Sequence, residues 1–454
     1  MEWFFRLAAL GNGIPLRAHR LENRLACFKF KFLWFLQHLS VPHQAAACSS
    51  SQHLNFLVMS PEVKTLLLGD HKVDLLLDGC RTDLSPVRAE RITQLVRSGV
   101  NWEGVCWWAR TNGVLPLLFA QLNAVCPADV PVPHFEQLRQ EAQAISLRNL
   151  RLTGELIRMA GKLEAAGIRA MPFKGPALAC LAYRNLAARS FNDLDVIVRK
   201  ADIPKAKAIL LGEGYQARAP FAETPVGEPW EAEYNAWNFD HPEKGITFDL
   251  HWTITSEHFS FPFDLDQCWG RAIPVSVGGT TLSTLCPEDY LLALCAHGYT
   301  HHWKKLAWVC DLAELIRATK KLNWGELMTR ARACRAERML LLGLRLAADL
   351  LGAELPDRIR ASLEADAAAR TLALQVRGWL FDESDGWRTT LQKRLLLLRA
   401  REGCRDRFQV LRHMVLTPNE RDRAFLSLPR SCGFLYYLVR PVRLLVGFVA
   451  RFLR

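Results

Sequence analysis

The chain has 454 residues, of which 50% are hydrophobic and 23% are charged. These values are typical of globular proteins and exclude a disordered or fibrous chain. The net charge is +12, but residues 1–58 hold +4 (six Lys/Arg against two Glu) and residues 425–454 hold +5 (five Arg and no acid), which leaves +3 for residues 59–424. Because this body is almost balanced, we expect no basic face for nucleic acid on it.

The thirteen cysteines are scattered between Cys27 and Cys432, and none forms a C-x-x-C pair. An odd number of scattered thiols indicates neither a zinc site nor a disulfide framework. It is typical of a reducing compartment, so we predict a cytoplasmic protein. Apolar runs are too short or too charged for a spanning helix, and the N-terminus lacks the pattern of a signal peptide.

Residues 1–58 do not read as a domain, because a short aromatic stretch is followed by a sequence of low complexity. We interpret them either as a loosely ordered extension or as untranslated sequence upstream of a start at Met59. Residues 59–160 have apolar residues at helical spacing and predict a helical region. Its expected helices cover residues 88–99, two parts of 100–125, and 135–167, the last ending at Gly167.

The pattern changes between residues 161 and 284, where short β-branched segments alternate with helical ones. This alternation predicts a small mixed sheet covered by helices, and hence an α+β fold. Residues 285–424 read as a helical domain, and 425–454 as a basic amphipathic tail. The expected strands are 168–173, 194–199, 245–252 and one or two in 275–285, and the expected helices between them are 176–184 and 202–215.

Three aspartates are predicted to meet at one end of this sheet. Side chains alternate along a strand, so Asp193 and Asp195 share one face, and Asp249 points away from the apolar residues beside it. Adjacent strands are about 4.8 Å apart, so the three carboxylates can converge. Such a cluster is costly without a cation, and Mg²⁺ is the hard divalent ion that leaves coordination positions for phosphate oxygens. The sequence therefore predicts a catalytic Mg²⁺ site.

A second segment predicts phosphate binding. Lys174 and Gly175 fall at an exposed strand-to-helix turn, where backbone N–H groups at a helix N-terminus favour anions. Pro176 removes one of these donors. Lys174 and Arg189 could neutralise phosphate charge, and with Gly175 and Ser190 they form the predicted nucleotide-binding set.

These residues together resemble a known family. K-G, a helix ending in Tyr, R-x-x-x-D-x-D and h-D-h-H-W are similar to the uncharacterised nucleotidyltransferase family of bacteria, which belongs to the polymerase-β-like superfamily. The resemblance covers about residues 85–320. It implies transfer of a nucleotidyl group from an NTP, with Asp193 and Asp195 as the metal-binding pair and Asp249 as the third carboxylate. The turn departs from the family pattern, because Pro176 stands where the superfamily has Gly or Ser.

Other polar residues favour structural roles. His251 is expected to lie in a hydrogen bond near Asp249 rather than to bind metal. His297 and His301 do not match the H-E-x-x-H zinc pattern, because Gly298 stands in place of Glu, so they predict helix packing or polar contacts on the substrate side. Asp311 lies in an apolar helical stripe and predicts a buried hydrogen-bonding residue against the catalytic domain.

The sequence thus predicts an Mg²⁺-dependent nucleotidyltransferase whose acceptor is a small molecule, a peptide, a protein or an RNA end. The alternative is a catalytically silent accessory of a biosynthetic or surface-polysaccharide assembly, docked on the membrane. Arg443, Arg451 and Arg454 lie along one helical face of the tail, which favours peripheral contact with an anionic inner membrane. The competing interpretation is docking of the tail on the body, which would bury its apolar face.

Overall fold

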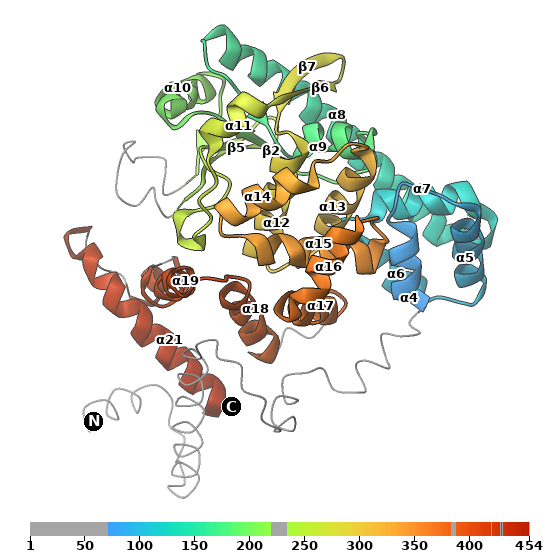
Figure 1. Ribbon diagram of the computed structural model, residues 1–454. Coiled ribbons are helices and arrows are strands. Elements are labelled where there is room, and N and C mark those ends of the chain that lie inside the picture. The colour runs from blue at the N-terminus through green and yellow to red at the C-terminus, as the bar shows by residue number, and fades with distance from the viewer. Residues whose placement is uncertain are drawn as a thin grey trace, which may run out of the picture. The chain divides into compact units, whose positions relative to one another are not determined.

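A computed structural model describes residues 71–218, 234–382, 387–418, 420–426, 428 and 430–453 (Figure 1). The extension predicted for residues 1–58 lies outside these ranges. The described chain starts with helices, continues through a small sheet, and returns to helices.

The first helical part ends in one long helix. α5 begins where the Ser85 hydroxyl accepts a hydrogen bond from the backbone N–H of Arg88. The long helix predicted for 135–167 is α8, Val132–Ala165, and it stops just before Gly167, whose φ of +75° suits glycine. The helices of this part are α4 (His71–Gly79), α5 (Pro86–Arg97), α6 (Trp102–Thr111), α7 (Leu115–Val125), η2 (Pro127–Asp129) and α8.

The sheet has five strands in the order β1-β2-β5-β4-β3. Only β2 and β5 run parallel, and the other neighbours are antiparallel. This mixed sheet confirms the predicted α+β fold. Three strands lie where the sequence predicts them, whereas β3 and β4 were not predicted. The strands are β1 (Met171–Pro172), β2 (Asp193–Ile197), β3 (Gln216–Ala217), β4 (Ala236–His241) and β5 (Ile246–His251).

Short helices and a hairpin surround the sheet. A π-helical turn, η3, continues α9 directly, and β6 and β7 pair as a separate two-stranded sheet. The elements are α9 (Gly175–Leu178), η3 (Ala179–Tyr183), η4 (Lys200–Asp202), α10 (Ile203–Gly212), η6 (Glu257–Phe259), α11 (Leu265–Arg271), β6 (Ile273–Val277) and β7 (Thr280–Thr284).

The two faces of the sheet have different surroundings. Leu194, Val196 and Phe248 are buried in a cluster with apolar residues of α8 and α10 (Figure 1). Phe173 and Ile197 are buried in another cluster, which includes residues of α12 and α13. Because side chains alternate, the residues between Leu194 and Val196 and between Phe248 and Leu250 face this second side. The apolar pattern therefore decides which way the aspartates point.

The chain after the sheet is helical. α15 ends at Gly352, which has a φ of +61°. Among the described residues, no helix has the length and apolar character to cross a membrane. The elements are α12 (Pro287–Thr300), α13 (Leu306–Ala318), α14 (Trp324–Ala333), α15 (Glu337–Leu351), α16 (Asp357–Ala365), α17 (Ala367–Leu380), α18 (Trp387–Arg399), α19 (Cys404–Leu416), α20 (Glu420–Phe425), η7 (Arg430–Leu435) and α21 (Tyr436–Leu453).

The orientation of α21 differs from what docking of the tail was expected to require. The helix packs against α19 and α20, and Arg440 and Arg443 both bind the carboxylate of buried Asp422. Arg440 also donates to the carbonyl oxygen of Met414 at 3.0 Å. Arg440 and Arg443 of α21 therefore face the protein. Docking was expected to bury the apolar side, but Leu438, Val442 and Leu445 stay exposed while Arg440 and Arg443 contact Asp422.

A stacked histidine pair predicts how stability depends on pH. The rings of His258 and His413 lie 3.6 Å apart and almost parallel, and burial lowers their pKa values to about 4 and about 3. The charge of Arg412 acts in the same direction on both. The folded protein binds fewer protons than the unfolded chain below pH 6.5, so its stability falls with decreasing pH. Because both rings are partly exposed, we expect this pair to lower the free energy of unfolding by about 2 kcal/mol when the pH falls from 7 to 5.

Urea unfolding of the wild type and His413→Phe at these two pH values checks this expectation. The phenyl ring keeps the stack but cannot be protonated, so the loss of unfolding free energy should be about 1 kcal/mol smaller in the variant than in the wild type. Equal losses in both proteins would show that the pair does not titrate.

Candidate active site

Two of the predicted aspartates are direct neighbours across the parallel strands. Asp195 of β2 and Asp249 of β5 are Cα partners in the sheet, and His251 of β5 lies on the same face. Ligand atoms of these three side chains all lie within 4.8 Å of one another. Asp195 and His251 are buried, and Asp249 is half-buried. The structure thus brings together Asp195, Asp249 and His251.

Asp193 lies at the start of β2, opposite Thr247, and is half-buried. Its carboxylate does not belong to the group formed by Asp195, Asp249 and His251, but the charges of the two aspartates affect its pKa. Burial, followed by the negative charge of Asp195, raises the pKa of Asp193 to about 6, and Lys174 opposes this rise. Burial and Asp195 also raise the pKa of Asp249. Both carboxyl groups therefore lack sufficient positive charge around them.

Asp195 is the best-compensated carboxylate of the cluster. Its Oδ1 accepts hydrogen bonds from Lys174 Nζ at 2.8 Å and from His251 Nε2 at 3.0 Å. Burial alone would raise its pKa, but the charge of Lys174 and the hydrogen bond from His251 hold it well below the usual range. Asp195 is therefore ionised at any pH near neutrality.

His251 orients Asp195 in this structure. The amide nitrogen of Asn235 lies 3.3 Å from His251 Nδ1, and an amide nitrogen can only donate. Nδ1 is thus the acceptor, and the proton of the neutral ring is on Nε2, which donates to Asp195. The predicted hydrogen bond of His251 exists, but its partner is Asp195 and not Asp249.

Asn238 is a site residue that the sequence analysis missed. Its Nδ2 donates to Asp249 Oδ1 at 2.7 Å from the neighbouring strand β4. This bond fixes one oxygen of Asp249 and leaves Oδ2 for other partners. The alternation of buried Trp237 and Phe239 with the polar residues of β4 is the signal that could have predicted the strand.

The Lys174–Gly175 turn connects β1 to α9, as predicted. Gly175 has a φ of +51°, and a Cβ at this position would lie 3.4 Å from the carbonyl oxygen of Asp193. Glycine adopts this left-handed conformation without strain, which explains its presence at the turn. Lys174 was expected to be exposed, but its side chain is only 14% exposed because it reaches back to Asp195.

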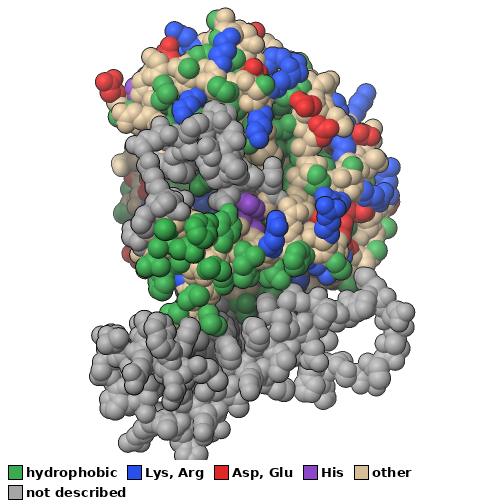
Figure 2. Space-filling view, turned by 90° about the vertical axis from the view of Figure 1, so that its left-hand side faces the viewer, with side chains coloured by type: hydrophobic (Ala, Val, Ile, Leu, Met, Phe, Trp, Pro, Cys, Tyr) green, Lys and Arg blue, Asp and Glu red, His purple; other side chains and the backbone are tan. Residues whose placement is uncertain are grey.

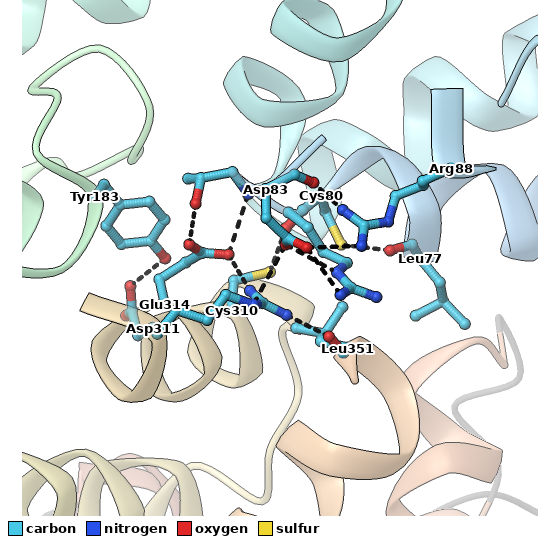
Figure 3. Close-up of polar contacts among 12 residues, drawn as sticks. Leu77, Cys80, Asp83, Arg88, Tyr183, Cys310, Asp311, Glu314 and Leu351 are labelled. Carbon is cyan, nitrogen blue, oxygen red and sulfur yellow. Dashed lines mark hydrogen bonds and ion pairs between the residues drawn. The ribbon is translucent and has the colours of Figure 1, made fainter. Parts of the chain in front are cut away.

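Arg189 and Ser190 make their contacts away from the aspartate cluster. Arg189 donates to both carboxylate oxygens of Asp311 on α13, at 2.7 and 2.9 Å. The Tyr183 hydroxyl donates to the same carboxylate at 2.7 Å, as Figure 3 shows. Ser190 accepts a hydrogen bond from Arg148 at 3.1 Å. These contacts confirm the structural role predicted for Asp311.

α13 also joins the catalytic part of the chain to the N-terminal helices. One turn beyond Asp311, Glu314 accepts hydrogen bonds from the backbone N–H of Thr82, at 3.1 Å, and from its hydroxyl (Figure 3). Cys310 donates to the carbonyl oxygen of Cys80 at 3.4 Å. One helix thus anchors Tyr183 and Arg189, which precede β2, to the helices before the sheet.

His297 in the last turn of α12 and His301 directly after the helix have ring centroids 4.5 Å from each other. Both rings pack on Trp308, at 5.1 and 5.5 Å. Burial lowers the pKa of His301 to about 4 and that of His297 well below its ordinary value, and the charge of Lys174 is the next cause for both. The two rings are therefore neutral and lie close enough to the cluster to feel Lys174.

Comparison with known proteins identifies the class. Residues 98–352, more than half of the chain, match the model of a family described as uncharacterised nucleotidyltransferase. The protein is therefore a nucleotidyltransferase, as the resemblance implied. It belongs to the uncharacterised nucleotidyltransferase family, and the matched range contains all of the site residues discussed above.

A solved structure shows a weaker similarity. It is the crystal structure of an antigenic nucleotidyltransferase-like protein from Paracoccidioides brasiliensis, which is 16% identical over 45% of this chain and 94% of its own, with a TM-score of 0.30. A similarity this low transfers no site residue. None of the curated proteins matches the sequence.

Proposed function

We propose that the protein transfers a nucleoside monophosphate from an NTP to an acceptor, in an Mg²⁺-dependent reaction that releases pyrophosphate. The observation that carries this proposal is the pairing of Asp195 with Asp249 across parallel strands, with Asp193 two residues away. Burial and mutual repulsion raise the pKa values of Asp193 and Asp249. A divalent cation would relieve that repulsion, so the donor set fits a hard metal ion.

Asp193, Asp195 and Asp249 would hold the metal. When bound, Mg²⁺ supplies positive charge to the transferring phosphoryl group and to the attacking and leaving oxygens. His251 keeps the carboxylate of Asp195 oriented through its 3.0 Å hydrogen bond. It is therefore proposed as a positioning residue rather than a ligand, since its Nε2 already carries the donated proton.

The chain's own residues would perform two further tasks. Asn238 occupies Oδ1 of Asp249, so Oδ2 remains to bind the metal or to accept the proton of an acceptor hydroxyl or amine. Lys174 and Gly175 would receive the triphosphate at the turn before α9. Arg189 and Ser190 are proposed to act there only indirectly, because their contacts hold the segment that leads into β2.

A second candidate is a catalytically silent binding protein that retains the fold. The observation in its favour is Pro176, which takes away a backbone donor in the first turn of α9. Such a protein would bind Mg²⁺–NTP without turnover, whereas intact carboxylates favour catalysis.

The test uses label position to recognise the transferred group. The protein is incubated with Mg²⁺, a cell extract and each NTP in turn, labelled at either the α- or the γ-phosphorus. We expect one NTP to label an acceptor from the α position only, and to release labelled pyrophosphate from the γ position. Labelling from the γ position would indicate a kinase reaction. Absence of labelling together with tight NTP binding would favour the silent protein.

Replacement of Lys174 is predicted to change metal binding and NTP binding in opposite directions. Its ammonium group lies 2.8 Å from Asp195 Oδ1, where it competes with a metal ion for the same oxygen. Lys174→Met should therefore strengthen Mn²⁺ binding to the nucleotide-free protein by roughly tenfold, while weakening NTP binding by a similar factor.

Titration calorimetry measures both affinities, and Lys174→Arg is the matched control because it keeps the cation. We expect the arginine variant to resemble the wild type more than the methionine variant does. A loss of both affinities in Lys174→Met would show that Lys174 helps to build the metal site instead of competing with it.

A further inference from the structure

The C-terminal helical segment carries almost all of the chain's charge. Residues 387–454 contain fifteen Lys/Arg and four Asp/Glu, a net charge of +11, whereas the whole chain has +12. This segment begins well after residue 352, where the family match ends. Its charge is thus a property added to the nucleotidyltransferase part and is not explained by nucleotide chemistry.

Three of the four acidic residues of this segment, Glu402, Asp406 and Asp422, make contacts within the protein. Asp422 is buried and binds Arg440 and Arg443. Asp406 is also buried, and it accepts a hydrogen bond from Ser260 at 2.5 Å and binds Arg335 at 3.0 Å. In addition, Glu402 accepts from the backbone N–H of Arg338 at 2.5 Å. Asp406 and Asp422 are thus buried and paired with arginines, so they contribute little negative charge to the surface, whereas Glu402 is exposed.

The outer side of the segment is apolar with exposed arginines. Since Arg440 and Arg443 hold the basic side of α21 on the protein, its apolar side is left exposed. α19 also exposes apolar residues, and Arg405 and Arg412 are exposed among them. We name the exposed apolar residues of the two helices the C-terminal apolar surface: Phe408, Val415, Leu416, Tyr437, Leu438, Val442, Leu445 and Val446.

The pictures agree with this assignment. α21 lies on the left-hand side of Figure 1, and this side faces the viewer in Figure 2. Figure 2 shows a dense group of hydrophobic side chains there, with blue Lys or Arg side chains at its edge. Large contiguous apolar surfaces on soluble proteins usually mark interaction sites.

We propose that the C-terminal apolar surface docks on an anionic lipid bilayer. Aliphatic and aromatic side chains on a helix that lies flat can enter the region between lipid head groups and acyl chains, while neighbouring arginines bind anionic head groups. The net charge of +11 complements a negative membrane surface. The absence of a membrane-crossing helix among the described residues is consistent with contact in the plane of the membrane. The proposal does not depend on nucleotidyl transfer.

Flotation of the full chain with vesicles tests the proposal, and the chain offers matched control positions. Leu438→Ser/Leu445→Ser alters residues that are 66% and 45% exposed on α21. Leu147→Ser/Leu211→Ser makes the same change at residues that are 64% and 45% exposed on α8 and α10. Both double variants should keep the wild-type unfolding midpoint. A third variant, Arg405→Gln/Arg412→Gln, removes charge and leaves the leucines unchanged.

We expect the wild type and the Leu147/Leu211 variant to float with vesicles containing phosphatidylglycerol, and not with pure phosphatidylcholine. The Leu438/Leu445 variant should bind at least about tenfold more weakly. Each arginine removed should weaken binding roughly fivefold at physiological salt, and 1 M salt should reduce binding of the wild type. Equal binding by the two leucine variants, or no flotation of the wild type, would overturn the proposal.

Binding of a different partner to the C-terminal apolar surface would also overturn the membrane proposal. If the surface joins two copies of the chain, light scattering will give a dimer mass for the wild type and a monomer mass for the Leu438/Leu445 variant, without flotation. If it binds RNA, a gel shift will depend on Arg405 and Arg412 and will be insensitive to the leucine substitutions.

Discussion

Asp195→Asn should reduce nucleotidyl transfer about a thousandfold, which corresponds to about 4 kcal/mol of transition-state stabilisation. Asp195 pairs with Asp249 across the parallel strands and receives hydrogen bonds from Lys174 and His251. The amide keeps the size of the side chain but removes the carboxylate with the lowest pKa of the cluster. Rates of acceptor labelling from α-labelled NTP measure the effect.

The matched control is Asp240→Asn on the neighbouring strand β4. Asp240 pairs with Arg218 at the exposed edge of the same sheet and belongs to no proposed site. We expect its rate to stay within about twofold of the wild type, because an exposed ion pair contributes little. Thermal unfolding of both variants shows whether the fold is intact. Transfer at the wild-type rate in folded Asp195→Asn would remove Asp195 from the mechanism.

Arg189→Ala should lower the free energy of unfolding by about 3 to 5 kcal/mol. The guanidinium group donates two hydrogen bonds to Asp311, whose side chain is only 1% exposed. Removal of Arg189 leaves the buried carboxylate of Asp311 with a hydrogen bond from the Tyr183 hydroxyl but without the positive charge that compensates it. Urea unfolding measures the difference from the wild type.

Arg97→Ala is the corresponding control, because Arg97 forms a similar pair with Asp129 at the protein surface. We expect it to cost less than about 1 kcal/mol. The sequence predicted that Arg189 binds nucleotide, and this measurement separates the two roles. Unchanged stability together with a raised KM for NTP would mean that Arg189 binds phosphate and that its ion pair with Asp311 is dispensable.

Local patterns predicted much of the cluster. The alternation of aspartates with apolar residues decided which face Asp195 and Asp249 occupy, because burial of Leu194, Val196 and Phe248 leaves only one direction for them. Asn238 was missed although β4 is as long as β5 and alternates buried with polar residues, because its contact with Asp249 depends on how the two strands pair. Strand pairing depends on the whole sheet and is only weakly encoded in one segment.

Ion pairs between distant segments were beyond the reach of sequence patterns. Arg189 and Asp311 are 122 residues apart, and the sequence around either residue does not indicate that the two form a pair. Even over the 18 residues between Asp422 and Arg440, the local sequence does not indicate the pair. Helical periodicity correctly predicts that one side of α21 is apolar, but which side meets the protein depends on a buried carboxylate elsewhere in the chain.

Binding of non-transferable nucleotides tests the central claim without knowledge of the acceptor. Calorimetry is performed with the four NTP analogues that carry a methylene bridge between the α- and β-phosphorus, with Mg²⁺ and with excess chelator. The account predicts that at least one analogue binds in Mg²⁺, that chelation abolishes this binding, and that folded Asp195→Asn does not bind it. Binding that is equally tight without metal, or absence of binding by all four analogues, would contradict the assignment of Asp193, Asp195 and Asp249 as an Mg²⁺–NTP site.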